Sequence, residues 1–174
     1  MQTHLVLTVI GPDRPGLVSA LSDTIAVSGG NWLESRMASL AGQFAGILLV
    51  DIASDRVDHL RAALQQLEVI GLRLVVEQGP VEAAAANSGR VLKLELIGQD
   101  RPGIVRDISR VLAEQHVSIS DFHTAFSSAS FSGEAMFKAT ALLRLPTGLD
   151  ENALRRALES LANELMVDLE LQDN

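Results

Sequence analysis

Hydrophobic residues follow two different spacings along the first half of the chain. Residues 3–10 alternate two sets of side chains, and Leu5, Leu7 and Val9 form the set predicted to be buried in a strand. Val18, Leu21 and Ile25 then recur at helical spacing, as on an amphipathic helix. The pattern predicts the order βαββαβ. Its elements are a strand at 3–10, a helix at 15–27, strands at 31–40 and 44–52, a helix capped by Ser54 or Asp55 and closed by Gly71, and a strand at 72–76.

The same pattern occurs twice. Ile-Gly-Pro-Asp-Arg-Pro-Gly-Leu-Val at 10–18 returns as Ile-Gly-Gln-Asp-Arg-Pro-Gly-Ile-Val at 97–105, an offset of 98 − 11 = 87 residues. A repeat of that length indicates two domains of one fold. We place them at 1–79 and 90–174, joined by a linker at 80–89 that is rich in alanine. The second copy predicts strands at 91–97, 117–126, 134–143 and 166–171, helices at 102–115 and 149–164, and seven inserted residues shared between 127–130 and 145–148.

This order predicts an α+β protein of two ferredoxin-like domains. Each domain should have a four-stranded antiparallel sheet with both helices on one face, because the helices carry apolar stripes and each sheet has one consistently apolar side. The open edges of such sheets invite pairing. We therefore expect the sheets to join edge to edge, within the chain or across a homo-oligomer.

The repeated motif has the chemistry of a tight turn into a helix. Pro15 suits a first helical position, and Arg14 before it is pushed toward extended geometry. Asp13 can accept hydrogen bonds from the first-turn amides, while Gly16 leaves those amides uncovered. A helix start of this kind can hold an anion such as a ligand carboxylate. A well-made helix start without any ligand explains the same residues, and the sequence leaves both interpretations open.

The two units, each with Asp-Arg-Pro-Gly between its first strand and first helix, resemble the ACT domain family. Gly-Gly-Asn-Trp after the first helix and His-Val-Ser-Ile in the second copy add to the likeness. The resemblance implies amino-acid binding at an interface between domains. Because Asn31 is replaced by Ser118 in the second copy, we favour the first site. The residues implied are Asp13, Arg14, Pro15, Gly16, Leu17, Asn31 and Trp32 in the first unit, and Asp100, Arg101, Pro102, Gly103, Ile104, Ser118 and Ile119 in the second.

Composition narrows the function classes. The formal net charge is −8 and the chain contains no run of Lys or Arg, which argues against direct nucleic-acid binding. The chain has no cysteine, its four histidines lack metal-ligand spacing, and no stretch has the length of a membrane span or the pattern of a signal peptide. We therefore expect a cytoplasmic protein with no cofactor, no metal and no membrane contact. Asp121 and His123, which share one face of a strand, are weaker candidates for lining a ligand site.

The resemblance favours a non-enzymatic regulator that senses a small amino acid such as glycine and controls transcription through a protein partner, for instance an activator. Two alternatives remain. One is a pairing module without ligand. The other is an acylphosphatase-like enzyme, in which an arginine of the first loop and an asparagine of the second strand hold a phosphate. Arg14 and Asn31 would match that pair, but the glycine-rich phosphate loop of such an enzyme is absent from the sequence. Trp32 has a simpler interpretation as a core or interface residue.

Overall fold

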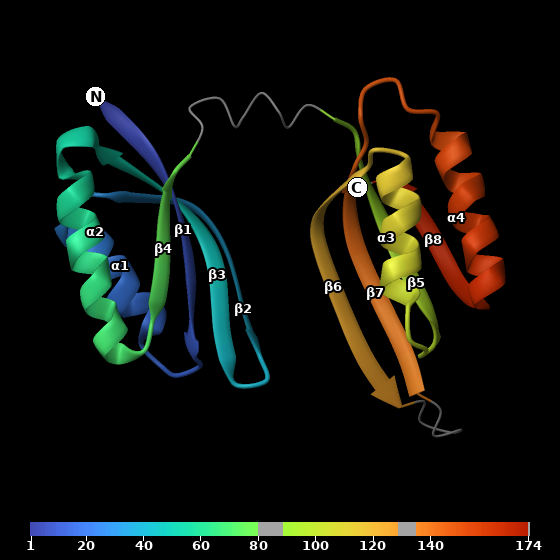
Figure 1. Cartoon of the computed structure of the whole chain (residues 1–174), viewed down its shortest axis with the longest axis horizontal. Helices are drawn as coiled ribbons and strands as arrows, with labels where there is room; N and C mark the ends of the chain where they lie inside the picture. The colour runs from blue at the N-terminus through green and yellow to red at the C-terminus, as the bar shows by residue number, and fades with distance from the viewer. Residues whose placement is uncertain (80–88, 129–134, 174) are drawn as a thin grey trace. The chain divides into compact units, whose positions relative to one another are not determined.

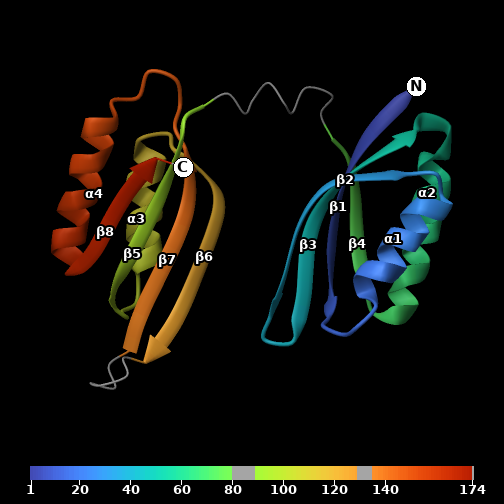
Figure 2. The same cartoon turned by 180° about the vertical axis from the view of Figure 1, so that it is seen from behind.

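The structure is a computed structural model that describes residues 1–79, 89–128 and 135–173. The chain divides into two compact units, Met1–Ala85 (unit 1) and Ala86–Asn174 (unit 2). Each unit has a four-stranded antiparallel sheet with helices on one face (Figures 1 and 2), which confirms the predicted α+β fold class. Most of the predicted linker, and residues 129–130 of the first predicted insertion, lie outside the described residues.

Unit 1 has the strand order β2-β3-β1-β4. The strand β3 is interior, and β1 pairs with β3 on one side and β4 on the other. The elements are β1 (Gln2–Pro12), α1 (Leu17–Val27), β2 (Asn31–Leu40), β3 (Gln43–Ala53), a 3-10 turn η1 (Ser54–Arg56), α2 (Val57–Gln65), a second 3-10 turn η2 (Gln66–Ile70) and β4 (Arg73–Gln78).

Unit 2 repeats this arrangement in the order β6-β7-β5-β8. Its second strand runs on to Ser128, so Ser127 and Ser128, which the sequence suggested for an inserted loop, extend the strand instead. The elements are β5 (Val91–Gln99), α3 (Ile104–Glu114), β6 (Ser118–Ser128), β7 (Ala135–Arg144), α4 (Glu151–Leu165) and β8 (Val167–Asp173).

Alternation along the strands separates the core from the outer face of each sheet. In unit 1, Leu5, Leu7 and Val9 are fully buried against the helices, while Val6 and Thr8 between them point the other way. Both cores are mainly aliphatic, in line with the aromatic content of only 3%, and Phe44 is a buried aromatic residue in unit 1. Trp32 is half-buried and packs against the core of unit 1, in agreement with its simpler interpretation.

The first helix of each unit begins two residues later than expected. Pro15 belongs to a turn, and α1 begins at Leu17 after Gly16, whose φ of 91° is left-handed. Unit 2 repeats this with Gly103, at φ 97°, before Ile104. Left-handed backbone is strained for residues with a Cβ, so glycine in the motif serves the turn itself. The expectation of Pro15 as the first helical residue was wrong for that reason.

The second helix of unit 1 also departs from the prediction. Ser54 and Asp55 do not cap α2, because they form the 3-10 turn η1 and the helix begins at Val57 with no side-chain cap. The hydroxyl of Ser54 donates instead to the carbonyl oxygen of Met1 at 2.8 Å. A tertiary hydrogen bond at the beginning of β1 therefore competes with the local capping preference. In the parts of the chain that the structure describes, no helix is long and apolar enough to cross a membrane.

Helix burial should dominate the stability of unit 1. Leu64→Ala, at a side chain that is 1% exposed, is expected to lower the free energy of unfolding by about 2–5 kcal/mol, since it removes packed methyl groups and leaves a cavity. Val69→Ala, at a residue 87% exposed, should change it by less than about 0.5 kcal/mol. Urea titration of both variants measures the difference. Equal effects would show that α2 is not held by this core.

Candidate functional site

The loop between β1 and α1 is held by backbone contacts at one end of the sheet. The amide of Asp13 donates to the carbonyl oxygen of Gly42, in the β2–β3 turn, at 2.9 Å. Gly11 approaches the start of β4 so closely that a Cβ there would lie 2.5 Å from the carbonyl oxygen of Gly71. A side chain on Gly11 would push the loop away from Gly71. Two neighbouring connections therefore fix where the loop leaves β1.

The first turn of α1 is open. Residues 12–16 are all exposed, and apart from Gly16 and its two chain neighbours no atom of the described residues lies within 4 Å of the position that a Cβ on Gly16 would take. The first amides of a helix lack acceptors within the helix, and the N-cap Gly16 has no side chain to supply one. The first turn of α1 also contains no acidic residue. Its positive dipole end is therefore available to an external anion.

The corresponding turn of unit 2 has a carboxylate and a guanidinium group beside it. Asp107 lies in the first turn of α3, and a Cβ on Gly103 would lie 3.7 Å from its Oδ2 and 3.1 Å from Nη2 of Arg106. The Asp107 side chain is 16% exposed. At the 87-residue offset, Ala20 of unit 1 occupies the place of Asp107. The two helix starts share a backbone and differ in chemistry.

A cluster of arginines keeps the Asp107 carboxylate charged. Nε of Arg106 donates to Oδ1 of Asp107 at 2.9 Å, and Nη2 of Arg110 lies 3.5 Å from the same oxygen. The hydrogen bond from Arg106, aided by the charges of Arg106, Arg110 and Arg101, lowers the pKa of Asp107 below its usual value. A negative charge therefore already lies in the first turn of α3, although no described side chain accepts a hydrogen bond from its amides, and this charge favours unit 1 as the place for a ligand anion.

Asn31 and Trp32 lie at the other end of the sheet from the loop. Asn31 is level with Asp51 and His4, at the beginning of β1, whereas the loop follows Pro12. The difference of 12 − 4 = 8 residues corresponds to roughly 27 Å along a strand. One small ligand cannot reach both ends. A single unit therefore does not bring these residues together, and their joint contact with a ligand at an interface between domains stays a prediction.

Unit 2 shows the same separation for the same reason. Ser118 is level with Arg144 and Val91 at the beginning of β5, and Asp100 follows the other end of that strand. Asp121 and His123 share the outer face of β6, where Oδ1 and Nε2 are 3.3 Å apart. They lie on an edge strand rather than in the loop before α3. The strands β5 and β6 run parallel, so both begin at the end of the sheet that is opposite to the start of α3.

The acidic residue Asp107 lies outside the repeated motif. The two copies of the motif end at residues 18 and 105, and Ala20 and Asp107 lie two residues beyond them. Alignment at the same offset already shows this difference. Only the structure shows that the Asp107 carboxylate lies in the first turn of α3, close to Gly103 and paired with Arg106.

The comparisons identify the family of both units. The ACT domain family model matches residues 3–76 and 90–172, and the chain belongs to that family. The protein is a tandem ACT-domain protein, with one matched segment in each unit.

Particular relatives extend over different parts of the chain. The glycine cleavage system transcriptional repressor of Escherichia coli is 21% identical over 170 residues, which cover 94% of this chain and 86% of the repressor. A UPF0237 protein of Methanopyrus kandleri is 36% identical over 85 residues, covering 47% of this chain and 94% of that protein. The crystal structure of a protein from Galdieria sulphuraria superimposes with a TM-score of 0.89 at 27% identity and covers 100% of this chain and 99% of that one. The chain is an ACT-domain protein of the regulatory kind, related to these proteins.

The pKa of Asp107 gives the helix start of unit 2 a pH-dependent contribution. The folded pKa is lowered, so the stabilisation is complete above the unfolded value of about 3.9 and is lost as the pH falls through the folded pKa. Asp107→Asn should therefore lower the melting temperature at pH 7, and the gap to the unsubstituted chain should narrow below about pH 4. Thermal unfolding from pH 7 to pH 3 measures this gap. A gap that stays constant over that range would contradict the assignment.

Proposed function

We propose that the protein is a non-enzymatic regulator that binds a small amino acid and acts on transcription through a protein partner. The single observation that supports it most directly is the open, uncapped first turn of α1 in an ACT domain. The two matched ACT segments cover nearly the whole chain. The similarity to a glycine cleavage system transcriptional repressor likewise extends over 94% of it. The acidic net charge of −8 favours a protein partner over DNA.

The ligand carboxylate would be held by the first amides of α1, those of Leu17 and Val18. Backbone amides at a helix start favour an anion through both hydrogen bonds and the helix dipole. Asp13 is exposed in the same loop, and its negative charge suits the ammonium group of the ligand. Asn31 and Trp32 could contact that ligand only from a second copy of the unit. Edge-to-edge pairing of antiparallel β2 strands would supply such a contact.

Unit 1 is the principal site in this proposal. In unit 2 the carboxylate of Asp107 lies in the first turn of α3, close to the Gly103 turn, and its charge would repel a ligand carboxylate there. The loop Asp100–Ile104 then serves as a helix start with an acidic residue of its own. The same family backbone would thus have one ligand-binding copy and one copy whose first turn is already acidic.

Transplanting that aspartate tests the site. Ala20→Asp should weaken the binding of glycine, alanine or serine about tenfold or more, because an internal carboxylate competes for the amides of α1 and repels the ligand's own. Ala20→Asn has nearly the same shape without the charge and should bind far better than Ala20→Asp. Isothermal titration of the three chains, each with its melting temperature checked, measures the difference.

The glycine of the turn is a poorer test position. Gly16→Val would be strained by a φ of 91° whatever binds there, so lost binding could follow from a displaced turn. Substitution at position 20 avoids this difficulty because unit 2 already carries aspartate at the matching place. Equal affinities for Ala20→Asp and the unsubstituted chain would show that α1 has only a structural start. No binding by any of the three chains would favour a pairing module without ligand.

Binding to DNA gives a second, independent test of the proposal. Most of the surface of a chain with net charge −8 repels a phosphate backbone, so the protein alone should give no specific band with promoter DNA at moderate salt. An electrophoretic mobility-shift assay measures this. A sequence-specific shift by the protein without any partner would overturn the partner-mediated mechanism.

A further inference from the structure

The sheet of unit 1 has an apolar surface on the side away from its helices. We call this surface the outer face of unit 1. The helices α1 and α2 cover only the opposite side of the sheet (Figures 1 and 2). Ile47 at the centre is 50% exposed, and Val75 and Ile10 are 58% and 39% exposed. Contiguous exposed apolar side chains of this kind mark interaction surfaces.

Strand register arranges the outer face in two neighbouring rows. The first row crosses the sheet through Glu34, Leu49, Val6 and Glu77. The second row crosses it through Arg36, Ile47, Thr8 and Val75. Each row is uncharged on the interior strands β3 and β1. The β2 edge carries charges of opposite sign in the two rows.

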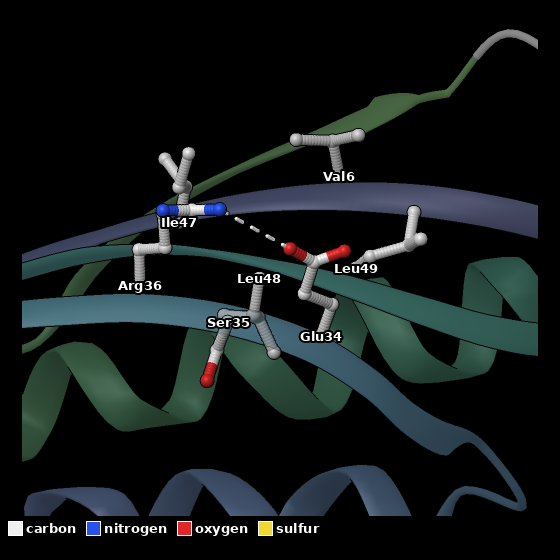
Figure 3. Close-up of a pocket in the computed structure, with 7 residues that line it drawn as sticks. All are labelled: Val6, Glu34, Ser35, Arg36, Ile47, Leu48 and Leu49. Atoms are coloured by element: carbon white, nitrogen blue, oxygen red, sulfur yellow. Dashed lines mark ion pairs between the residues drawn. The ribbon is translucent and has the colours of Figure 1, made fainter. Parts of the chain in front are cut away.

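A hollow of about 210 Å³ lies where the two rows meet. Figure 3 shows Val6, Ile47 and Leu49 on the side of the sheet away from the helices, with Glu34 and Arg36 beside them. Oε1 of Glu34 and Nη2 of Arg36 are 3.6 Å apart. The surface is therefore an apolar depression with an acidic and a basic group at one rim.

The same face of unit 2 is charged. Its row through Thr140, which corresponds to the row of Ile47, places Glu95 and Glu170 on the neighbouring strands. Lys93 lies beside Glu95, with Nζ 2.6 Å from Oε1. A shared fold therefore carries two different outer faces. Covering the charged one with apolar groups would cost the hydration of these charges.

We propose that the outer face of unit 1 binds the same face of a second copy of the chain. Two sheets that pack face to face bury their apolar sides about 10 Å apart, with strand directions nearly aligned. A two-fold axis makes such a contact self-complementary, since each patch meets itself. The pattern of charge on the outer face meets that requirement.

The charge pattern specifies the orientation of the pair. The two-fold axis would lie between the two sheets, perpendicular to the strands and midway between the two rows. Each strand of one copy then lies over the same strand of the other copy and runs in the opposite direction. Glu34 of each copy then faces Arg36 of the other, and the two opposite-sign contacts occur at the β2 rim. Ile47 of each copy faces Leu49 of the other and fills the hollow beside it. Apolar burial at the centre and charge matching at the rim favour the same partner.

A central charge should disrupt this pair. Ile47→Glu is expected to raise the dissociation constant of the dimer about 30-fold or more, because it places a carboxylate at the centre of an apolar contact. Thr140→Glu makes the matched change at the equivalent position of unit 2 and should leave the dimer intact. Sedimentation equilibrium over a concentration series measures both, after circular dichroism has shown that each variant is folded.

Charge reversal tests the contact between copies directly. Glu34→Arg and Arg36→Glu chains should each associate more weakly than the unsubstituted chain, since like charges then meet across the axis. An equimolar mixture of the two should form mixed dimers, because each rim now meets its opposite. A monomeric unsubstituted chain at about 100 μM, well above ordinary dimer dissociation constants, would overturn the proposal. So would a dimer unaffected by Ile47→Glu, or a mixture that fails to pair.

Discussion

The pairing of β1 with β3 on one side and β4 on the other is the constraint on which each unit depends. It places β1 inside the sheet, so its alternating side chains must serve a core on one face and a surface on the other. It also holds the end of β1 in place, from which the loop to α1 begins. Since β2 runs parallel to β1, its first residues belong to the far end of the sheet. Both the helix start and its distance from Asn31 follow from this pairing.

Duplication kept the backbone of this arrangement and changed its chemistry at two places. The left-handed glycine before the first helix is present in both units, at Gly16 and Gly103. The residue that follows one turn later is alanine in one unit and aspartate in the other, which separates a helix start without an acidic residue from one with a carboxylate in its first turn. The outer faces differ as well, with Ile47 and Thr140 at matching positions. Unit 1 therefore carries both surfaces on which our proposals rest.

These two surfaces are separate regions of unit 1. The helix start lies at the end of the sheet where β1 runs out, and the hollow by Ile47 lies on the broad face away from the helices. A ligand at the first and a second copy at the second would compete for no side chain. Edge pairing of β2, expected from the open edges of the sheet, uses a third region and remains a prediction.

The sequence by itself determined the repeat, the βαββαβ order and the aliphatic cores, because local spacing of hydrophobic residues reports which face of each element is buried. It also singled out the Asp-Arg-Pro-Gly loops. Only the tertiary structure decided that Asn31 and the loop lie at opposite ends of one sheet, since strand direction and register depend on pairing between distant residues. Only the tertiary structure also showed that the Asp107 side chain lies close to Gly103, and that Glu34 and Arg36 lie in neighbouring rows of one face. Such neighbours are created by the fold, and no spacing along the chain records them.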